Sequence, residues 1–182
     1  MKKLGKLLLR TFGKITLDKG PIAKILRHHW DRLVLKGLDK KSNIHKGAII
    51  TGTGEKLVIK AHSGIGIRCQ VGSNLYIGEH TMMGPDCIIL TQNHKFDKDC
   101  HAFEGMETKS FSIGDNCWIG ISTIILPGAR IDNNCIIGAG SGVPGKKYPD
   151  NVLIAGKPAI IKKYLVKLKK RLLNHESYCS FV

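Results

Sequence analysis

Aliphatic side chains recur at every sixth position through two long stretches of this chain. The first series is Ile59, Ile65, Val71, Ile77, Met83 and Ile89, and the second is Ile113, Ile119, Ile125, Ile131, Ile137 and Val143. A small side chain stands four residues after most of them, at Ser63, Cys69, Thr81, Cys87, Cys117, Thr123, Ala129, Cys135 and Ser141, with Leu75 as the one large exception. Two runs of this length indicate a structural repeat of six residues.

A period of six excludes an α-helix, because residues six apart on a helix point in very different directions. A short strand and a tight turn return the inward side chain at that interval, so each hexad predicts one flat side of a coil. Three sides make a coil of about 18 residues, and coils stack at roughly 4.8 Å. The predicted fold class is an all-β solenoid, a parallel β-helix of about five coils over residues 42–156. Glycines following the aliphatic residues are assigned to corners that resist side chains.

The repeat is interrupted at two places. A three-residue slip at residues 51–56 predicts a wider turn between coils. A longer excursion spans roughly residues 94–112, and because Ile89 and Ile113 are 24 residues apart, or four hexads, the coil can resume in phase. Loops held by a rigid scaffold commonly carry function, so we expect the chemistry in this protruding loop.

Both ends of the chain are basic, whereas the repeat region is neutral. Residues 1–41 carry 12 basic and 3 acidic side chains, residues 42–156 carry 10 of each, and residues 157–182 carry 7 and 1. We interpret 1–41 as a basic helical N-terminal extension and 157–182 as a basic C-terminal helix and tail, with an amphipathic helix at 159–174. These ends fit a cap on the solenoid, a subunit contact or an anionic membrane surface. Aromatic residues are few and no recognition motif is present, which argues against nucleic acid.

The cysteines indicate the compartment. Cys69, Cys87, Cys117 and Cys135 all fall at the small inward position, so we expect free thiols in the core. The first residues interrupt their apolar run with Lys6 and Arg10, unlike a secretory signal. A reducing cytoplasm is the expected location, with the basic ends available for contact with the inner face of the membrane.

Three segments are more distinctive than the repeat itself. They are IGDNCWIGISTIILPGARIDNNCIIGAGS from Ile113, the closing NVLIAGKPA from Asn151, and TQNHKFD at the root of the loop. Together they resemble the hexapeptide-repeat acyltransferases, particularly the sugar O-acetyltransferases that act on galactosides, maltose and polysaccharides. The resemblance covers residues 59–163, and it alone supplies the expectation that the β-helix is left-handed, since parallel crossovers are generally right-handed.

The resemblance implies an acetyl-CoA-dependent O-acetyltransferase acting on a sugar hydroxyl in polysaccharide or lipopolysaccharide assembly. In that family the histidine at the root of the loop is the general base, and the matching residue is His94. Asn93 is expected at the small inward position beside it. Asp97 and Asp86 are both candidates to orient the imidazole, and spacing does not choose between them.

For the cofactor, the resemblance implies that the pantetheine arm of acetyl-CoA lies along the outside of the last coils, with no metal required. By position, Ile121, Ala139 and Gly140 would offer main-chain groups. The lysines expected to contact the CoA phosphates are Lys146, Lys147, Lys157, Lys162 and Lys163. This set is broad because Ile160 stands where the family commonly has a basic residue.

The family further implies a homotrimer in which the sugar acceptor, free, lipid-linked or part of a polysaccharide, meets His94 between adjacent solenoids. Two other readings remain open. A γ-type carbonic anhydrase uses the same fold and three histidines, for which His62, His80, His94 and His101 are candidates, and a noncatalytic β-helix scaffold has the same repeats. The interrupting loop argues against the scaffold, because a spacer has no need of it.

Overall fold

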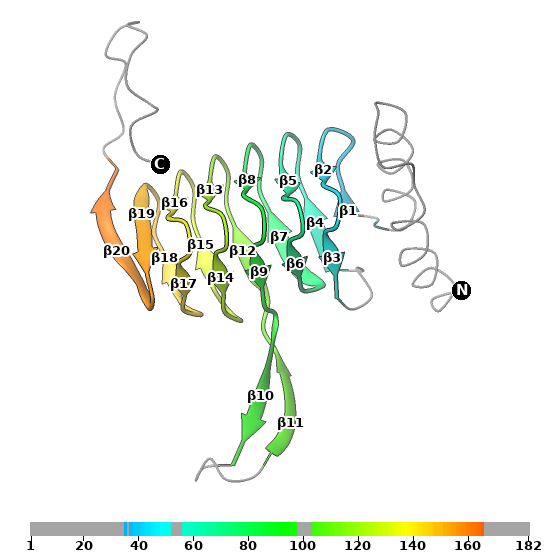
Figure 1. The fold of residues 1–182 in the computed structure, drawn as a ribbon, viewed down its shortest axis with the longest axis vertical. Helices are drawn as coiled ribbons and strands as arrows, with labels where there is room; N and C mark the ends of the chain where they lie inside the picture. Colours follow the sequence, from blue (N-terminus) through cyan, green and yellow to red (C-terminus); the bar gives the residue numbers. More distant parts are fainter. Residues whose placement is uncertain (1–34, 36, 52–55, 98–102, 166–182) are drawn as a thin grey trace, which may run out of the picture.

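The computed structural model describes residues 35, 37–51, 56–97 and 103–165, and these form a three-sided solenoid with one long arm (Figure 1). The first face stacks β1 (Gly37–Leu38), β4 (Lys56–Ile59), β7 (Asn74–Ile77), β12 (Phe111–Ile113), β15 (Arg130–Ile131) and β18 (Lys147–Tyr148). The second face stacks β2 (Asn43–Ile44), β5 (Gly64–Ile65), β8 (Met82–Met83), β13 (Trp118–Ile119), β16 (Ile136–Ile137), β19 (Val152–Gly156) and β20 (Ala159–Tyr164). The third face stacks β3 (Ile49–Ile50), β6 (Gln70–Val71), β9 (Ile88–Ile89), β14 (Ile124–Ile125) and β17 (Gly142–Val143).

The solenoid is longer than the sequence predicted. Its six parallel strands on each of the first two faces and five on the third make about six coils, where about five were expected. The predicted range began at residue 42 and so included β2 and β3, whereas the structure adds β1 in front of them and completes the first coil. The predicted class, a parallel β-solenoid, is confirmed.

The pairing register confirms the predicted phase. Ile113 pairs with Ile131, a step of one 18-residue coil. The step from Asn43 to Gly64 is 21 residues, which places the three-residue slip in a wider turn of that coil. Across the arm, Ile89 pairs with Ile125, so the inserted arm occupies the length of one further coil and the stack continues without a shift.

The core consists of the predicted aliphatic ladder. All twelve residues of the two series are buried, as are the small residues four positions later and the exceptional Leu75. Cys69, Cys87, Cys117 and Cys135 are buried free thiols, as expected. In the coil stack the backbone N–H of Cys87 donates to the sulfur of Cys69 at 3.4 Å, and that of Cys135 to Cys117 at 3.3 Å. The side-chain contact with Cys69 is the larger cause, and burial the second, that raises the pKa of the Cys87 thiol.

The glycines serve a different purpose from the one predicted. The left-handed corner positions are mostly occupied by other residues, in the series His62, Arg68, His80, Asp86, Asn116, Ser122, Asn134 and Asn151. Glycine is instead required where coils approach closely: a Cβ on Gly84 would lie 2.7 Å from the backbone N of Ile121, and one on Gly120 would lie 2.5 Å from that of Ala139. The repeated glycine is therefore a packing requirement between coils.

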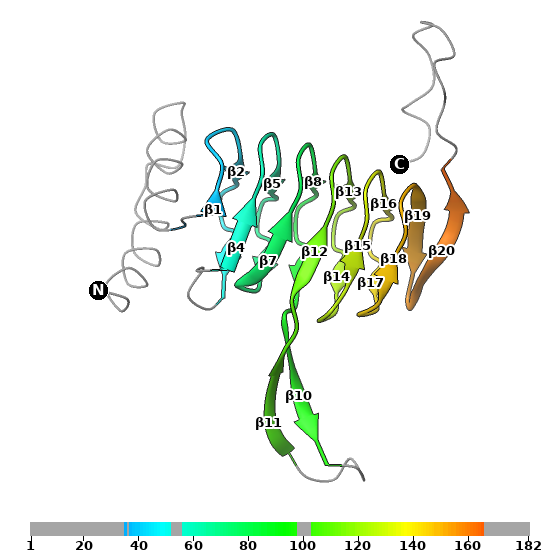
Figure 2. The same cartoon turned by 180° about the vertical axis from the view of Figure 1, so that it is seen from behind.

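The predicted loop is a two-stranded antiparallel arm. It consists of β10 (Gln92–Phe96) and β11 (Phe103–Thr108), and it protrudes well away from the coils in both views (Figures 1 and 2). The predicted end at residue 112 was wrong, because Phe111 is buried and already pairs with Leu75 in the first face. Its aromatic side chain occupies the same phase as Leu75, where most hexads have a small side chain.

The predicted C-terminal helix is wrong for its first turns. Residues 159–164 form β20, which runs antiparallel to β19, with Ala155 opposite Ile160. The unpaired edge of β19 offers backbone hydrogen bonds, and the β-branched pair Ile160 and Ile161 suits a strand. The rest of that prediction, and the predicted helix within residues 1–41, lie outside the described residues. None of the described residues forms a helix long and apolar enough to cross a bilayer.

Candidate active site

His94 lies on the outer arm, exposed and flanked by aromatic rings. It is in β10 and pairs across the arm with Met106 of β11. Its imidazole lies 5.2 Å from the ring of Phe103 in an edge-on arrangement and 6.5 Å from that of Phe96. The arm therefore presents one nitrogen-bearing ring on an otherwise apolar face, because Phe96, Phe103 and Met106 are 54%, 60% and 49% exposed.

The two predicted neighbours of His94 are placed differently from each other. Asn93 was expected to point inward, but it is exposed and pairs with Glu107, because the coil ends at the buried Thr91 two residues earlier. Its side-chain oxygen accepts a hydrogen bond from the backbone N–H of His94 at 3.0 Å. Asp97 is half-buried and lies just beyond β10. Asn93 therefore fixes the backbone at His94.

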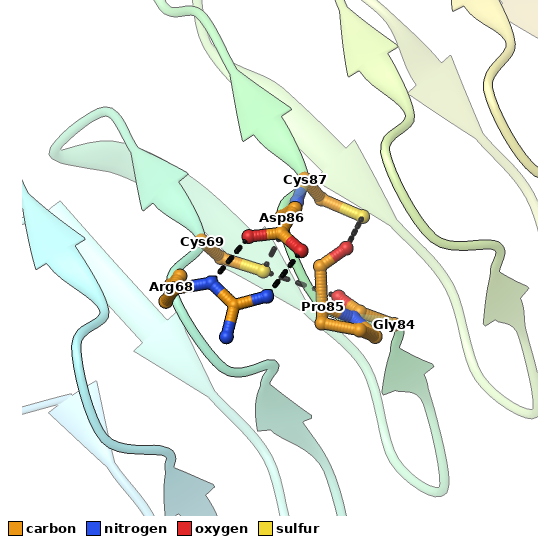
Figure 3. Close-up of polar contacts among 6 residues, drawn as sticks. All are labelled: Arg68, Cys69, Gly84, Pro85, Asp86 and Cys87. Carbon is orange, nitrogen blue, oxygen red and sulfur yellow. Dashed lines mark hydrogen bonds and ion pairs between the residues drawn. The ribbon is translucent and has the colours of Figure 1, made fainter.

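Asp86, the other candidate for orienting the imidazole, is held elsewhere. The Arg68 guanidinium donates to its two carboxylate oxygens at 2.7 and 2.6 Å, from one coil to the next (Figure 3). Both residues occupy left-handed corner positions above the buried Cys69 and Cys87. The hydrogen bond from Arg68 lowers the pKa of Asp86 below its ordinary value. This pair is a surface link between coils.

We predict that Asp86→Asn changes stability only modestly at neutral pH and leaves turnover unchanged. An acid with a lowered pKa contributes stability above its ordinary pKa, about 3.9, and loses that contribution as the pH falls through the lowered value. The variant should therefore lose this part of the fall in stability at acid pH, which is measured as melting temperature against pH. Both groups are solvent-exposed, so high salt should reduce the difference. A large fall in kcat would instead indicate that Asp86 orients the imidazole of His94.

The predicted main-chain cofactor groups share one corner, between the second and third faces. Going along the stack, this corner contains Ile67, Pro85, Ile121 and Ala139, with Gly140 one residue further on. Within the described residues, the N–H groups of Ile121 and Ala139 make no hydrogen bond, whereas the Gly140 N–H donates to Ile121 O at 2.8 Å. The corner is thus a ridge with unused donors at Ile121 and Ala139, and Gly140 can offer only its carbonyl.

The predicted lysines divide between two places. Lys157 follows β19, and because Ile137 pairs with Ile154 it lies beside Gly140 at the next level of this corner; Lys162 and Lys163 are exposed on β20. Lys146 lies at the corner between the third and first faces, with its ammonium 5.4 Å from the buried Tyr148 ring. Lys147 forms an ion pair with Asp132 at 3.3 Å. Of the five predicted lysines, only Lys157, Lys162 and Lys163 lie near the ridge of the predicted cofactor groups in the single chain.

The histidines that the structure describes do not converge on a metal position. His62 and His80 stack in adjacent coils with ring centroids 4.8 Å apart, while His94 is on the arm. Among residues 35, 37–51, 56–97 and 103–165, no group of three His, Cys, Asp or Glu side chains could hold a metal ion. His101 lies outside them.

Comparison with known proteins places this architecture in a family. The bacterial transferase hexapeptide pattern (six repeats) matches residues 112–145. A Saccharomyces cerevisiae protein provisionally named an acetyltransferase is 37% identical over 166 residues, which cover 79% of this chain and 81% of that protein. Galactoside O-acetyltransferase of Lactococcus lactis is 38% identical over 91 residues, which cover 50% of this chain but only 44% of that protein.

Solved structures show the same fold. A hexapeptide-repeat acetyltransferase from Vibrio cholerae superposes with a TM-score of 0.78 at 23% identity, covering 91% of this chain and 90% of that chain. A maltose O-acetyltransferase from Clostridium difficile gives 0.70 at 25% identity, covering 91% and 87%. The Vibrio protein has also been crystallised with acetyl coenzyme A.

The solenoid with a histidine-bearing arm is thus the left-handed β-helix of acetyltransferases. The chain belongs to the hexapeptide-repeat acetyltransferase family.

Proposed function

We propose that this protein transfers the acetyl group of acetyl-CoA to a hydroxyl of a sugar, with His94 as general base. The observation that carries the proposal is the pairing of two features: an exposed imidazole on the arm, and a ridge of unused N–H groups that leads to Lys157. The names of the relatives, galactoside and maltose O-acetyltransferases, support a sugar acceptor. A further relative, provisionally named a lipopolysaccharide biosynthesis O-acetyltransferase in Escherichia coli, supports a role in surface polysaccharide assembly.

The reaction needs one proton acceptor and one oxyanion site. An imidazole nitrogen of His94 takes the hydroxyl proton as the sugar oxygen attacks the thioester carbonyl carbon. A tetrahedral oxyanion forms and is stabilised by N–H donors. The C–S bond then breaks and leaves the acetyl ester on the sugar. The departing thiolate takes the proton back from His94 and is released as free CoA. The packing of His94 against Phe103 holds the ring for this transfer.

The arm also supports assembly into a homotrimer. Its three large apolar side chains, Phe96, Phe103 and Met106, are about half exposed in the single chain, which is unfavourable on a projection into water. Contact with the next solenoid would bury them and bring His94 to a neighbouring cofactor ridge. Sedimentation equilibrium should give three times the 20.0 kDa chain mass, and a monomer with full activity would exclude this arrangement.

Location follows as a further proposal. We place the protein in the cytoplasm, where acetyl-CoA is available, with the basic ends of the chain directed to an anionic membrane surface when the acceptor is lipid-linked. The charge of the segments 1–41 and 157–182 supports this.

The direct test of the function is release of free thiol from acetyl-CoA across a panel of sugar acceptors. Turnover that depends on both substrates, with an acetyl ester in the product, is expected. Absence of CoA binding would refute the proposal, and bound zinc in the purified protein would favour a carbonic anhydrase.

Lys157→Gln should weaken the binding of acetyl-CoA without changing the rate of acetyl transfer. Lys157 is exposed at the end of the ridge, where it can contact a CoA phosphate, and an exposed charge contact of this type is worth about 1 kcal/mol. We expect the KM for acetyl-CoA to rise roughly fivefold at low salt, with kcat retained, and the difference to shrink as salt is added. Lys56→Gln, on the first face, is the matched control. Equal KM values for the two variants would remove Lys157 from the cofactor site.

A further inference from the structure

A groove of about 280 Å³ opens on the second face, over the first three coils. It is lined by Lys41, Asn43, His45, His62, Met82 and Met83 among others. Its hollow arises at Gly64, which pairs with Asn43 on one side and Met82 on the other. Because Gly64 has no side chain between two larger neighbours, the face is open at this point.

One end of the groove carries the cation of Lys41 and several side chains that can form hydrogen bonds. Lys41 is exposed, and its ammonium forms no ion pair with any residue that the structure describes. Asn43 and His45 contact each other at 3.1 Å, and His62 is held in place by stacking on His80. Among the described residues that line the groove none is acidic, and Asp39, the nearest acid in sequence, accepts a hydrogen bond from the backbone N–H of Lys41. A ligand here meets donors and positive charge.

The other end of the groove is apolar. Met82 is 65% exposed, and it pairs in register with Trp118, which is 44% exposed on the next coil of the same face. A sugar ring has an apolar face of C–H groups that packs well on such side chains. The groove thus matches a molecule with an apolar ring face and an anionic substituent.

The groove and the arm of the same chain lie on opposite sides of the solenoid. Figures 1 and 2 both place β2, β5 and β8 at one side of the stack and β10 and β11 projecting from the other. A ligand in this groove would therefore receive His94 from a second copy of the chain. This geometry fits a site shared between subunits.

We propose that this groove binds the acceptor and selects an acidic sugar, one carrying a carboxylate or a phosphate, with Lys41 and His62 holding the anion. The inference rests on the proposed function for the transfer step, but the binding preference stands by itself. The groove is not apparent in the sequence, because Lys41 and Asn43 lie in the first coil, before the long aliphatic series that starts at Ile59.

Calorimetric titration without acetyl-CoA tests the binding preference. Galacturonate, galactose 1-phosphate and galactose serve as probes, since they share a ring and differ in charge. We expect at least one of the two acids to bind about tenfold more tightly than galactose, the range of a hydrogen bond to a charged group, and the tighter acid identifies the substituent. Lys41→Gln should abolish the preference, whereas Lys56→Gln should retain it.

The same probes as acetyl acceptors separate this inference from the proposed function. Charge-selective binding that Lys41→Gln abolishes, without acetyl transfer, would support the groove and refute the function. Acetyl transfer to galactose with no preference for either acid, unchanged in Lys41→Gln, would support the function and overturn the groove. If neither acid binds more tightly than galactose, the proposed anion preference of the groove is likewise overturned. His62→Gln provides a second variant, since an exposed corner side chain can be changed without altering the core.

Discussion

Replacing His94 with alanine should lower kcat by about a hundredfold to ten-thousandfold while leaving the affinity for CoA unchanged, because general base catalysis contributes that much and the imidazole acts on the acceptor hydroxyl and not on the CoA phosphates. The side chain is exposed on the arm, so its loss leaves the coils intact. Steady-state turnover measured as free thiol, with CoA affinity by calorimetry, gives both quantities.

The matched control for this result is Lys95→Ala, the next residue of β10, whose side chain points to the opposite face of the strand. It should retain turnover within a few-fold. If both variants lose activity equally, the arm acts as a structural contact and His94 is not the base. If neither loses activity, the proton acceptor lies elsewhere.

Ile119→Ala should destabilise the solenoid by about 2 to 5 kcal/mol, the cost of removing a large aliphatic side chain from a packed core. Ile119 is fully buried, and it stacks between Met83 and Ile137 of the adjoining coils. Urea unfolding followed by circular dichroism measures the loss. Since each coil contacts only its neighbours, the lost stability should appear as easier opening around the fourth coil.

Ile121→Ala is the informative comparison for that variant, because the same substitution is made two residues away. Ile121 is 46% exposed on the cofactor ridge, so its truncation should cost well under half as much. Its main-chain N–H remains, so the cofactor donor is retained. Equal destabilisation by the two changes would contradict the assignment of the inward phase.

The solenoid could be predicted because its pattern recurs many times. Each aliphatic residue of the two series from Ile59 to Val143 supports the phase of the next, and all of them are buried. The start of the first coil could not, because β1, with the buried Leu38, lies before the residues over which the repeat can be recognised. The strand β20 was mistaken for a helix because a short apolar run has no decisive period, and the edge of β19 decides its conformation.

The site was predictable only in part. His94 follows from its place where the coil is interrupted, a feature visible in sequence, but the outward direction of Asn93 depends on where pairing across the arm begins. Asp86 was a fair candidate until the structure paired it with Arg68, one coil earlier, which a period of 18 could have suggested. The groove at Lys41 depends on which coil lies beside which, and that information is contained in the tertiary stack.

The antiparallel direction of β20 also determines how the protein can grow. A stack of parallel coils ends in an open strand edge that another stack could extend, as happens in fibres. Here the last described strand reverses and presents the exposed Lys162 and Lys163, whose charges disfavour the approach of a second positively charged edge. End-to-end polymerisation through this strand edge is thereby discouraged.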